Sequence, residues 1–354
     1  MRRFMVVLLL VMGQAVPASA APGPPRLVFE GWDAAGEQWA AAANLKGRVL
    51  LKVPGVEPLT SIDDGVLMLT RHLRGGLASK LVAYDASTGE RRYQIADARF
   101  PLLFGDGAGV VFLPDNDGTG RGDADRDPYV NSVWYKDLAT GTEVKLAQFT
   151  DGDYWPMDLA VSPDGSLVAF TEGNDQWRFV WNIWLAETDG SSLVELVAGD
   201  ASMTPAFSPD GATVAYAHWE GTCTSGVRVI GVDGSGARTL TEGTCDMGLT
   251  RPVWLDADTL VAWWWAQKPD LSGFRPMGLV SVDVATGQVD PTPIAKARVV
   301  DFSVSRELGS IAYRTRLGDL FLYDVATGTT TALPGGRKLI GWHLHLDGSY
   351  ELAV

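Results

Sequence analysis

Residues Ala160–Phe170 read AVSPDGSLVAF, and residues Ala206–Tyr216 read AFSPDGATVAY. The two segments share a central Ser-Pro-Asp-Gly and the apolar residues on either side of it, and the serines Ser162 and Ser208 are 46 residues apart. A near-repeat at this period predicts a chain built from copies of one supersecondary unit.

Two kinds of turn extend this repeat along the chain. The first is an Asp-Gly between two apolar runs, at Asp64-Gly65, Asp106-Gly107, Asp164-Gly165, Asp210-Gly211 and Asp347-Gly348. The second is an Asp-x-x-Thr-Gly after a strand-like run, at 85–89, 137–141, 283–287 and 324–328. Glycine permits positive φ and aspartate accepts hydrogen bonds from nearby backbone N–H groups, so both sequences favour hairpin turns. With weaker copies there are about seven turns of each kind, roughly 40 to 60 residues apart, which is typical of four-stranded propeller blades.

The order of the turns predicts an all-β propeller of four-stranded antiparallel blades. Six intact units occupy 58–98, 99–151, 152–199, 200–246, 247–296 and 297–337. Each end of the mature chain carries half a unit, so we expect a seventh blade shared by 338–354 and 21–57, closed by pairing of N- and C-terminal strands. The segment Arg26–Glu30 does not fit neatly and is taken as an extra strand. Six blades remain an alternative, and a β-sandwich is disfavoured because sandwiches rarely keep one turn chemistry over so many copies.

The pattern x-F-S-P-D-G-x-x-V-A-[FY] around Ser162 and Ser208 resembles the TolB-like repeat of bacterial exported β-propellers, which is related to WD-type repeats. The resemblance is strongest over 154–245 and implies the propeller fold and an exported location. In such repeats these residues shape turns and perform no chemistry. The chain lacks room for the separate N-terminal domain of TolB itself, so membership of the Tol complex is not implied.

The first 20 residues have the pattern of a bacterial signal peptide. Arg2 and Arg3 precede the apolar run Phe4–Met12, and Ala18-Ser19-Ala20 supplies an A-x-A cleavage site. We therefore expect a periplasmic or secreted protein in which 21–354 form one propeller domain without a transmembrane segment. The net charge of −14 disfavours nucleic acid and anionic membranes as partners, since both bind basic patches. We expect a monomer.

The long connections of the predicted blades fall on one face, which we call the loop-rich face. With strands labelled a to d, the short Asp-Gly turns join a to b and c to d, whereas long insertions join b to c or d to the next a. These insertions span 115–131, 172–182, 220–226 and 266–278. Because function concentrates on long loops held by a rigid scaffold, we expect the binding site there or at the channel mouth.

An acidic loop on this face resembles a calcium-binding loop. Oxygen-bearing side chains alternate around a glycine, at Asp115, Asp117, Thr119, Asp123 and Asp125. Ca²⁺ takes six to eight oxygen ligands, and a turning backbone can aim several at one ion. A twelfth-position glutamate is missing, and a solvated acidic loop without metal is the alternative. We predict calcium as a cofactor that stiffens this loop.

Aromatic residues give the second candidate site. Six map to the loop-rich face or its margin: Trp155, Trp177, Trp181, Trp219, Trp265 and Phe274. Aromatic rings can stack on sugars or hold a partner's side chains, although packing between neighbouring blades is the more frequent use of such a ring. Cys223 and Cys245 map to the same face and are predicted to form a structural disulfide, as befits an exported protein; two buried thiols are the alternative.

Catalytic patterns are scarce. No nucleophile elbow, P-loop or H-x-x-x-H pair occurs, and His343 and His345 are better explained by packing than by a metal. The sequence therefore favours a non-enzymatic binding or scaffold module for a protein or glycan partner, with no catalytic residues. The alternative is a propeller hydrolase or lyase that uses acidic residues near the channel, namely Asp158, Asp246 and Asp301, which serve more often as hydrogen-bonded braces.

Overall fold

The computed structural model describes residues 26–32, 38–44, 46, 48–54, 56–63, 66–72, 79–85, 88–96, 98–103, 108–114, 132–149, 154–174, 181–199, 201–220, 224–269, 273–290, 294–295, 298–306, 308–333 and 344–346. Within these ranges the chain forms antiparallel strands joined by turns, with no α-helix. Accordingly, none of the described residues belongs to a helix long and apolar enough to cross a bilayer.

The described strands form seven sheets. Three of them lie in the first half of the chain: β4 (Val56–Asp63), β5 (Val66–His72), β6 (Ser79–Asp85) and β7 (Arg91–Ala96); β8 (Ala98–Leu103), β9 (Gly109–Pro114), β10 (Ser132–Asp137) and β11 (Glu143–Gln148); β12 (Tyr154–Val161), β13 (Leu167–Asn174), β14 (Asn182–Glu187) and β15 (Leu193–Val197).

Three more follow in the second half: β16 (Ser202–Phe207), β17 (Thr213–Glu220), β18 (Thr224–Gly231) and β19 (Arg238–Thr241); β20 (Gly248–Trp254), β21 (Thr259–Gln267) and β22 (Phe274–Asp283); β23 (Val299–Ser305), β24 (Ser310–Thr315), β25 (Leu320–Asp324) and β26 (Thr329–Ala332). The β20–β22 sheet has three strands, and isolated bridges Leu279↔Ala295 and Val282↔Val289 flank its outer strand.

The seventh sheet combines the two ends of the chain. Its order is β27 (Leu344–Leu346), β1 (Arg26–Trp32), β2 (Gln38–Asn44) and β3 (Val49–Pro54), and Val28 lies opposite His345 in the register of β1 and β27. The segment 26–30, which fitted the sequence repeat poorly, is thus the second strand of a four-stranded sheet.

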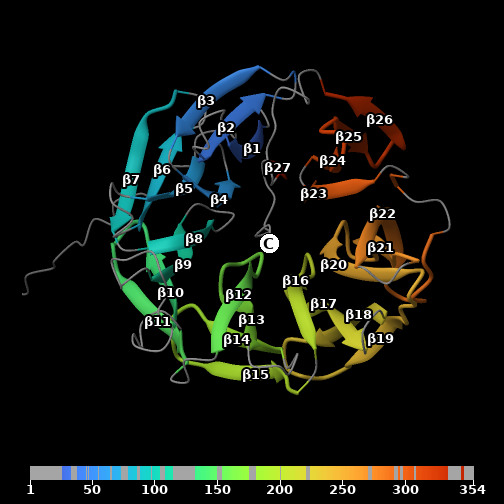
Figure 1. Cartoon of the computed structure of the whole chain (residues 1–354). Helices are drawn as coiled ribbons and strands as arrows, with labels where there is room; N and C mark the ends of the chain where they lie inside the picture. Colours follow the sequence, from blue (N-terminus) through green and yellow to red (C-terminus); the bar gives the residue numbers. More distant parts are fainter. Residues whose placement is uncertain are drawn as a thin grey trace, which may run out of the picture.

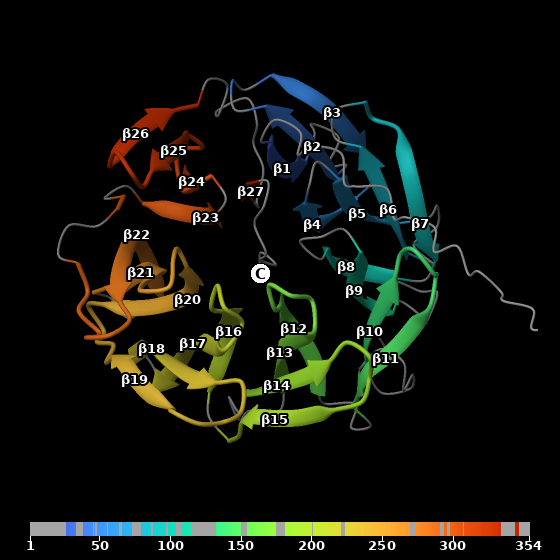
Figure 2. The ribbon, with the colours of Figure 1, turned by 180° about the vertical axis from the view of Figure 1, so that it is seen from behind.

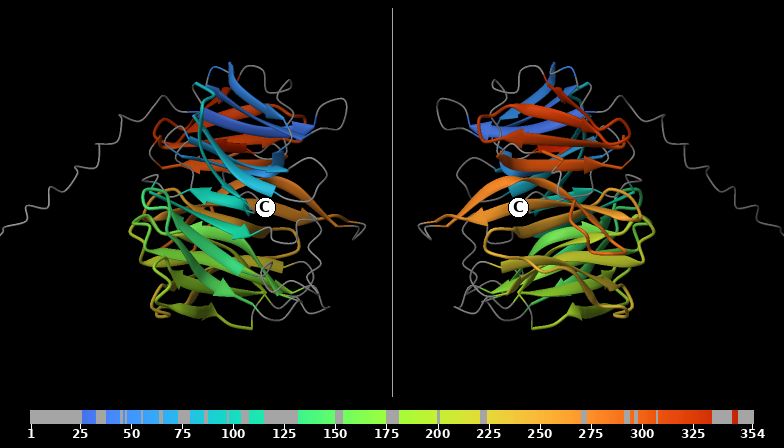
Figure 3. Two further views of the ribbon diagram at one scale, coloured as in Figure 1. Left: turned by 90° about the vertical axis from the view of Figure 1, so that its left-hand side faces the viewer. Right: turned by 90° about the vertical axis from the view of Figure 1, so that its right-hand side faces the viewer.

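The sheets surround a common centre. Figures 1 and 2 show β4, β8, β12, β16, β20 and β23 facing it, while later strands of each sheet lie farther out. From the side, the orange hairpin of β21 and β22 projects beyond the other coloured strands (Figure 3). These two strands are also the longest, with 9 and 10 residues.

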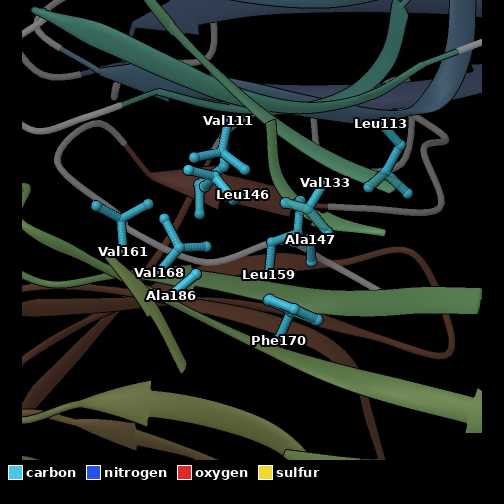
Figure 4. Close-up of a cluster of buried hydrophobic side chains, with 11 residues drawn as sticks. Val111, Leu113, Val133, Leu146, Ala147, Leu159, Val161, Val168, Phe170 and Ala186 are labelled. Carbon is cyan, nitrogen blue, oxygen red and sulfur yellow. The ribbon is translucent and has the colours of Figure 1, made fainter. Parts of the chain in front are cut away.

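The hydrophobic core lies between sheets. Each of seven clusters of buried side chains draws its members from two neighbouring sheets. Figure 4 shows one of them, in which Val111, Leu146 and Val133 from β8–β11 meet Leu159 and Phe170 from β12–β15. Residues of β1–β3 pack against β5 of the next sheet in sequence and also against β24 and β25 of the sheet near the other end of the chain.

Alternation along a strand lets one strand serve two clusters. In β17, Val214 and Tyr216 pack toward the preceding sheet, whereas Ala215 packs toward the following one. Successive side chains of a strand point to opposite faces, so a run of continuously apolar residues is expected wherever both faces are covered. In β17 the side chains on one face are therefore larger than Ala215 on the other.

The predicted turn chemistry is confirmed at the described turns. Asp283 accepts hydrogen bonds from the Thr286 N–H at 2.7 Å and hydroxyl at 2.6 Å, and Gly287 adopts φ 73°. Asp137, Thr140 and Gly141 repeat the arrangement, and the hydrogen bonds from Thr140 lower the pKa of Asp137. In the other turn type, the hydroxyl of Ser162 donates to Asp164 at 2.7 Å and accepts from the Leu167 N–H.

Replacement of the turn glycines separates local strain from contact between sheets. Gly141 has open space around it, so Gly141→Ala costs only the positive φ, about 1 kcal/mol of unfolding free energy. A methyl group at Gly287 would lie 2.0 Å from the Leu240 carbonyl oxygen of the neighbouring sheet. We expect Gly287→Ala to reduce the unfolding free energy clearly more than Gly141→Ala in urea denaturation. Equal losses would contradict the close approach of the two sheets.

Candidate functional site

The innermost strands carry bulges at matching positions around the centre. The ladder between the first two strands shifts register at Met157/Ala160, Met203/Ala206 and Thr250/Val253 in three successive sheets. At these bulges Asp158, Thr204 and Arg251 adopt φ values of 49°, 52° and 50°. Non-glycine residues rarely adopt this conformation, which costs on the order of 1–3 kcal/mol each. The three strained residues line one cavity of about 60 Å³, together with Arg306 from the β23–β26 sheet.

An ion pair beside this cavity links one sheet to the next. The Arg251 guanidinium donates from Nη1 to Asp301 Oδ1 at 2.8 Å, and it lies 4.9 Å from the centre of the Phe302 ring. The same carboxylate oxygen accepts from the Phe302 N–H at 2.9 Å. Asp301 is 3% exposed, so the pair links β20 to β23 inside the structure.

Asp158 is the carboxyl group among the described residues that line the cavity. Its Oδ2 accepts from the Thr204 N–H at 3.2 Å, whereas its Oδ1 makes no hydrogen bond to the described residues. Burial raises the pKa of Asp158; the Thr204 N–H, the nearby Thr171 hydroxyl and the charge of Arg251 oppose that rise only in part. Asp158 and Asp301 therefore differ in environment, because only Asp301 has a direct cationic partner.

The two carboxyl groups predict opposite effects of amide substitution. A pKa raised by folding means that stability is greatest below the unfolded value of about 3.9 and declines as pH rises through the folded value. We therefore expect Asp158→Asn to raise the melting temperature at pH 7, with the gain vanishing near pH 3. Asp301→Asn serves as the matched control, because it removes the charge that pairs with the 15% exposed Arg251 side chain, and we expect it to lower the melting temperature at pH 7. Destabilisation by Asp158→Asn at pH 7 would show that its carboxylate is needed in the charged form.

Three aromatic residues of the predicted binding set form one cluster, which we call the aromatic cluster. Trp219 near the end of β17 stacks on Trp265 near the end of β21, with ring centres 5.0 Å apart and planes at 14°. Phe274 at the start of β22 meets Trp265 edge-on at 4.2 Å and Trp219 at 5.7 Å. Trp265 is 4% exposed and Phe274 is 41% exposed, so the cluster has a buried base and an open edge.

A glycine opposite Trp265 makes this arrangement possible. Gly248 pairs with Trp265 in the β20–β21 ladder, and a Cβ atom there would lie 2.2 Å from the indole ring. The indole N–H groups of Trp219 and Trp265 are buried and donate to no acceptor among the described residues. The neighbouring indoles have such acceptors, since Trp263 donates to the Val299 carbonyl at 2.9 Å and Trp264 to the Asp246 carbonyl at 3.4 Å.

The aromatic cluster lies on the face that the sequence predicted. Its residues sit at the end of second strands β17 and β21 and at the start of third strand β22, beside the connections from second to third strands. Parts of the predicted insertions 220–226 and 266–278 are strand, because β18 begins at Thr224 and β22 at Phe274. Trp181 forms a backbone bridge to Ala201, whose carbonyl accepts a hydrogen bond from the Trp219 N–H at 2.9 Å. The side chain of Trp155, the residue Trp177 and the five predicted calcium ligands, Asp115, Asp117, Thr119, Asp123 and Asp125, lie outside the described residues.

Of the other predicted residues, some lie at the central cavity, and others lie elsewhere or outside the described residues. Asp158 lines the central cavity, and Asp301 pairs with Arg251, which also lines it. Asp246 lies in the connection between β19 and β20 and is not among the described lining residues. Within the described residues no His, Cys, Asp and Glu side chains gather as a metal site, and no cysteine is free. Cys223 is outside the described residues, so its bond to Cys245 stays a prediction.

Sequence reasoning missed Thr204 and Arg251 at the cavity. A signal was present, because Asp158, Thr204 and Arg251 follow one another at 46 and 47 residues, close to the 46-residue spacing of the serines of the repeat. Thr204 and Arg251 also precede prolines, which mark a break in the ladder.

Comparison with known proteins shows the fold. No family model and no curated protein sequence matches the chain. Among solved structures, the β-propeller domain of the trilobed protease from Pyrococcus furiosus is 16% identical with a TM-score of 0.58, covering 90% of this chain and 94% of that one. An oligogalacturonate lyase in complex with manganese is 13% identical with a TM-score of 0.59, covering 87% and 84%.

The tricorn protease is 13% identical with a TM-score of 0.60 over 90% of this chain, but the match spans only 36% of the protease chain. At these identities the resemblance shows a β-propeller fold alone. The activities of these proteins belong to them and are not transferred by the shared fold.

Proposed function

We propose that the chain is an exported, non-enzymatic β-propeller binding module that engages a glycan or protein partner through its loop-rich face. The observation that carries this proposal is the aromatic cluster, in which a 41% exposed Phe274 rests on buried Trp265. Aromatic anchors with a rigid base make strong contacts at low entropic cost. A buried ring alone would serve packing, whereas an open ring offers contact area to a partner.

The same proposal includes the finer features that the sequence predicts. The seven sheets would be seven blades of TolB-like repeats, closed where β27 pairs with β1. The signal peptide would direct the chain to the periplasm or the outside, and calcium would stiffen the 115–125 loop.

A hydrolase or lyase centred on the cavity is the second candidate. Asp158 favours it, since a carboxyl group with a raised pKa and a buried Oδ1 that makes no hydrogen bond to the described residues can serve as a general acid. The volume of the cavity argues against a substrate site there. About 60 Å³ holds water-sized molecules, whereas ligand pockets usually span about 300–1,000 Å³. Asp301 is already engaged by Arg251 and the Phe302 N–H. An activity abolished by Asp158→Asn with the fold intact would favour the enzyme.

The binding module is tested by an exposed substitution that spares the buried base of the cluster. We expect Phe274→Ala to weaken retention of partners from a culture or periplasmic extract, and binding on a glycan array, by about tenfold, as for an interface anchor worth over 1 kcal/mol. Val194→Ala is the matched control, because Val194 is 45% exposed on the outer strand β15. Equal binding by both variants and the unchanged protein would exclude this face.

A further inference from the structure

We infer that the partner of this face is an acidic oligosaccharide, a chain of sugar rings that carry carboxylate or sulfate groups. The inference rests on the proposed binding function and assigns the ligand class to that site. Its basis is a group of four cationic side chains, which we call the basic pocket, next to the open edge of the aromatic cluster.

The basic pocket has the size of a ligand site. Its volume is about 670 Å³, and it is lined by Lys268, Pro269, Phe274, Arg275, Pro276, Arg298 and Arg316. This is within the range of pockets that accept ligands of a few sugar units in size, about 300–1,000 Å³. Phe274 belongs both to this pocket and to the aromatic cluster, so the two form one continuous surface.

The fold brings the four cations together from two sheets. Lys268 follows β21 and Arg275 lies in β22, at the projecting end of that hairpin (Figure 3). Arg298 precedes β23 and Arg316 follows β24 in the next sheet, and the Arg316 N–H donates to the Arg298 carbonyl at 2.9 Å. That backbone hydrogen bond fixes the two arginines side by side.

The charges of the basic pocket are not balanced within the described structure. No Asp or Glu is among its described lining residues, and none of its four cations forms an ion pair with another described side chain. The whole chain has 43 acidic against 29 basic residues, so such a grouping runs against the overall charge. The four cations repel one another at short range, and an anion bound among them would be attracted to each of them.

The order of side chains matches a sugar chain better than a single anion. Trp219 belongs to the β16–β19 sheet, Trp265 and Phe274 to the next, and Arg298 and Arg316 to the one after that. The surface therefore extends over three sheets, from aromatic to cationic. A uronic acid ring combines both requirements, because its apolar face stacks on an aromatic ring while its carboxylate accepts hydrogen bonds from a guanidinium.

The test uses titration calorimetry with the full chain and three main probes, each a chain of the same number of units. These are a β-1,4-linked glucuronate hexamer, cellohexaose, which is its neutral counterpart, and hexaglutamate. We expect the glucuronate hexamer to bind most tightly, cellohexaose at least about tenfold more weakly, and salt to weaken only the charged interaction. Sulfated cellohexaose distinguishes sulfate from carboxylate as the preferred anion.

Paired substitutions locate the site. We expect Arg298→Gln with Arg316→Gln to weaken the glucuronate hexamer about tenfold or more. The control, Arg91→Gln with Lys145→Gln, removes the same charge from exposed positions on β7 and β11 and should leave binding unchanged. Melting curves identify any unfolded variant, and the salt dependence of the unsubstituted protein then tests the charge contribution independently.

Three results would overturn the inference. They are equal binding of the glucuronate hexamer and cellohexaose, tighter binding of hexaglutamate, which would point to an acidic peptide, and equal losses in the two double variants. If no acidic probe binds while partner retention still depends on Phe274, the ligand class is wrong and the binding function stands. If retention is independent of Phe274 as well, both fail.

Discussion

Face-to-face packing of neighbouring sheets is the interaction on which the rest of the structure depends. A four-stranded sheet of this size has no core of its own, and each buried cluster here is completed by the next sheet along. Phe170 and Phe302 are fully buried at two such interfaces. Burial of a phenylalanine side chain contributes about 1.5–3 kcal/mol, so contact with its neighbours stabilises each sheet. The sheet that contains β1–β3 packs on both sides as well, although its strands come from opposite ends of the chain.

This arrangement explains what could be predicted from the sequence. The turns are local, since Asp283, Thr286 and Gly287 recognise one another within five residues, and the sheets therefore occur close to their predicted boundaries. The Arg251–Asp301 pair could not be predicted in this way, because its partners are 50 residues apart and meet only when two sheets pack. Likewise, the sequence placed Trp219, Trp265 and Phe274 on one face, but only the hairpin geometry and Gly248 bring their rings into contact.

The two candidate sites differ in how their residues are packed. At the centre, strained backbone and buried charge join successive sheets, and the cavity left between them is small. On the loop-rich face, the long β21–β22 hairpin carries aromatic and cationic side chains away from the packed interfaces. A propeller scaffold that fixes its interior in this way leaves its connections free to vary, which fits the range of proteins that share the fold and little sequence.

The most direct test of this account is whether the two ends of the chain share a sheet in solution. For the trilobed protease propeller an open velcro topology is described, whereas here Val28 of β1 lies opposite His345 of β27. We predict that Val28→Cys with His345→Cys forms a disulfide on mild oxidation, seen by mass spectrometry of peptides, and raises the melting temperature. Val28→Cys with Val194→Cys, which lies on β15 of another sheet, should not cross-link. A folded Val28/His345 variant that stays reduced would contradict the pairing and with it the account of how the sheets are held together.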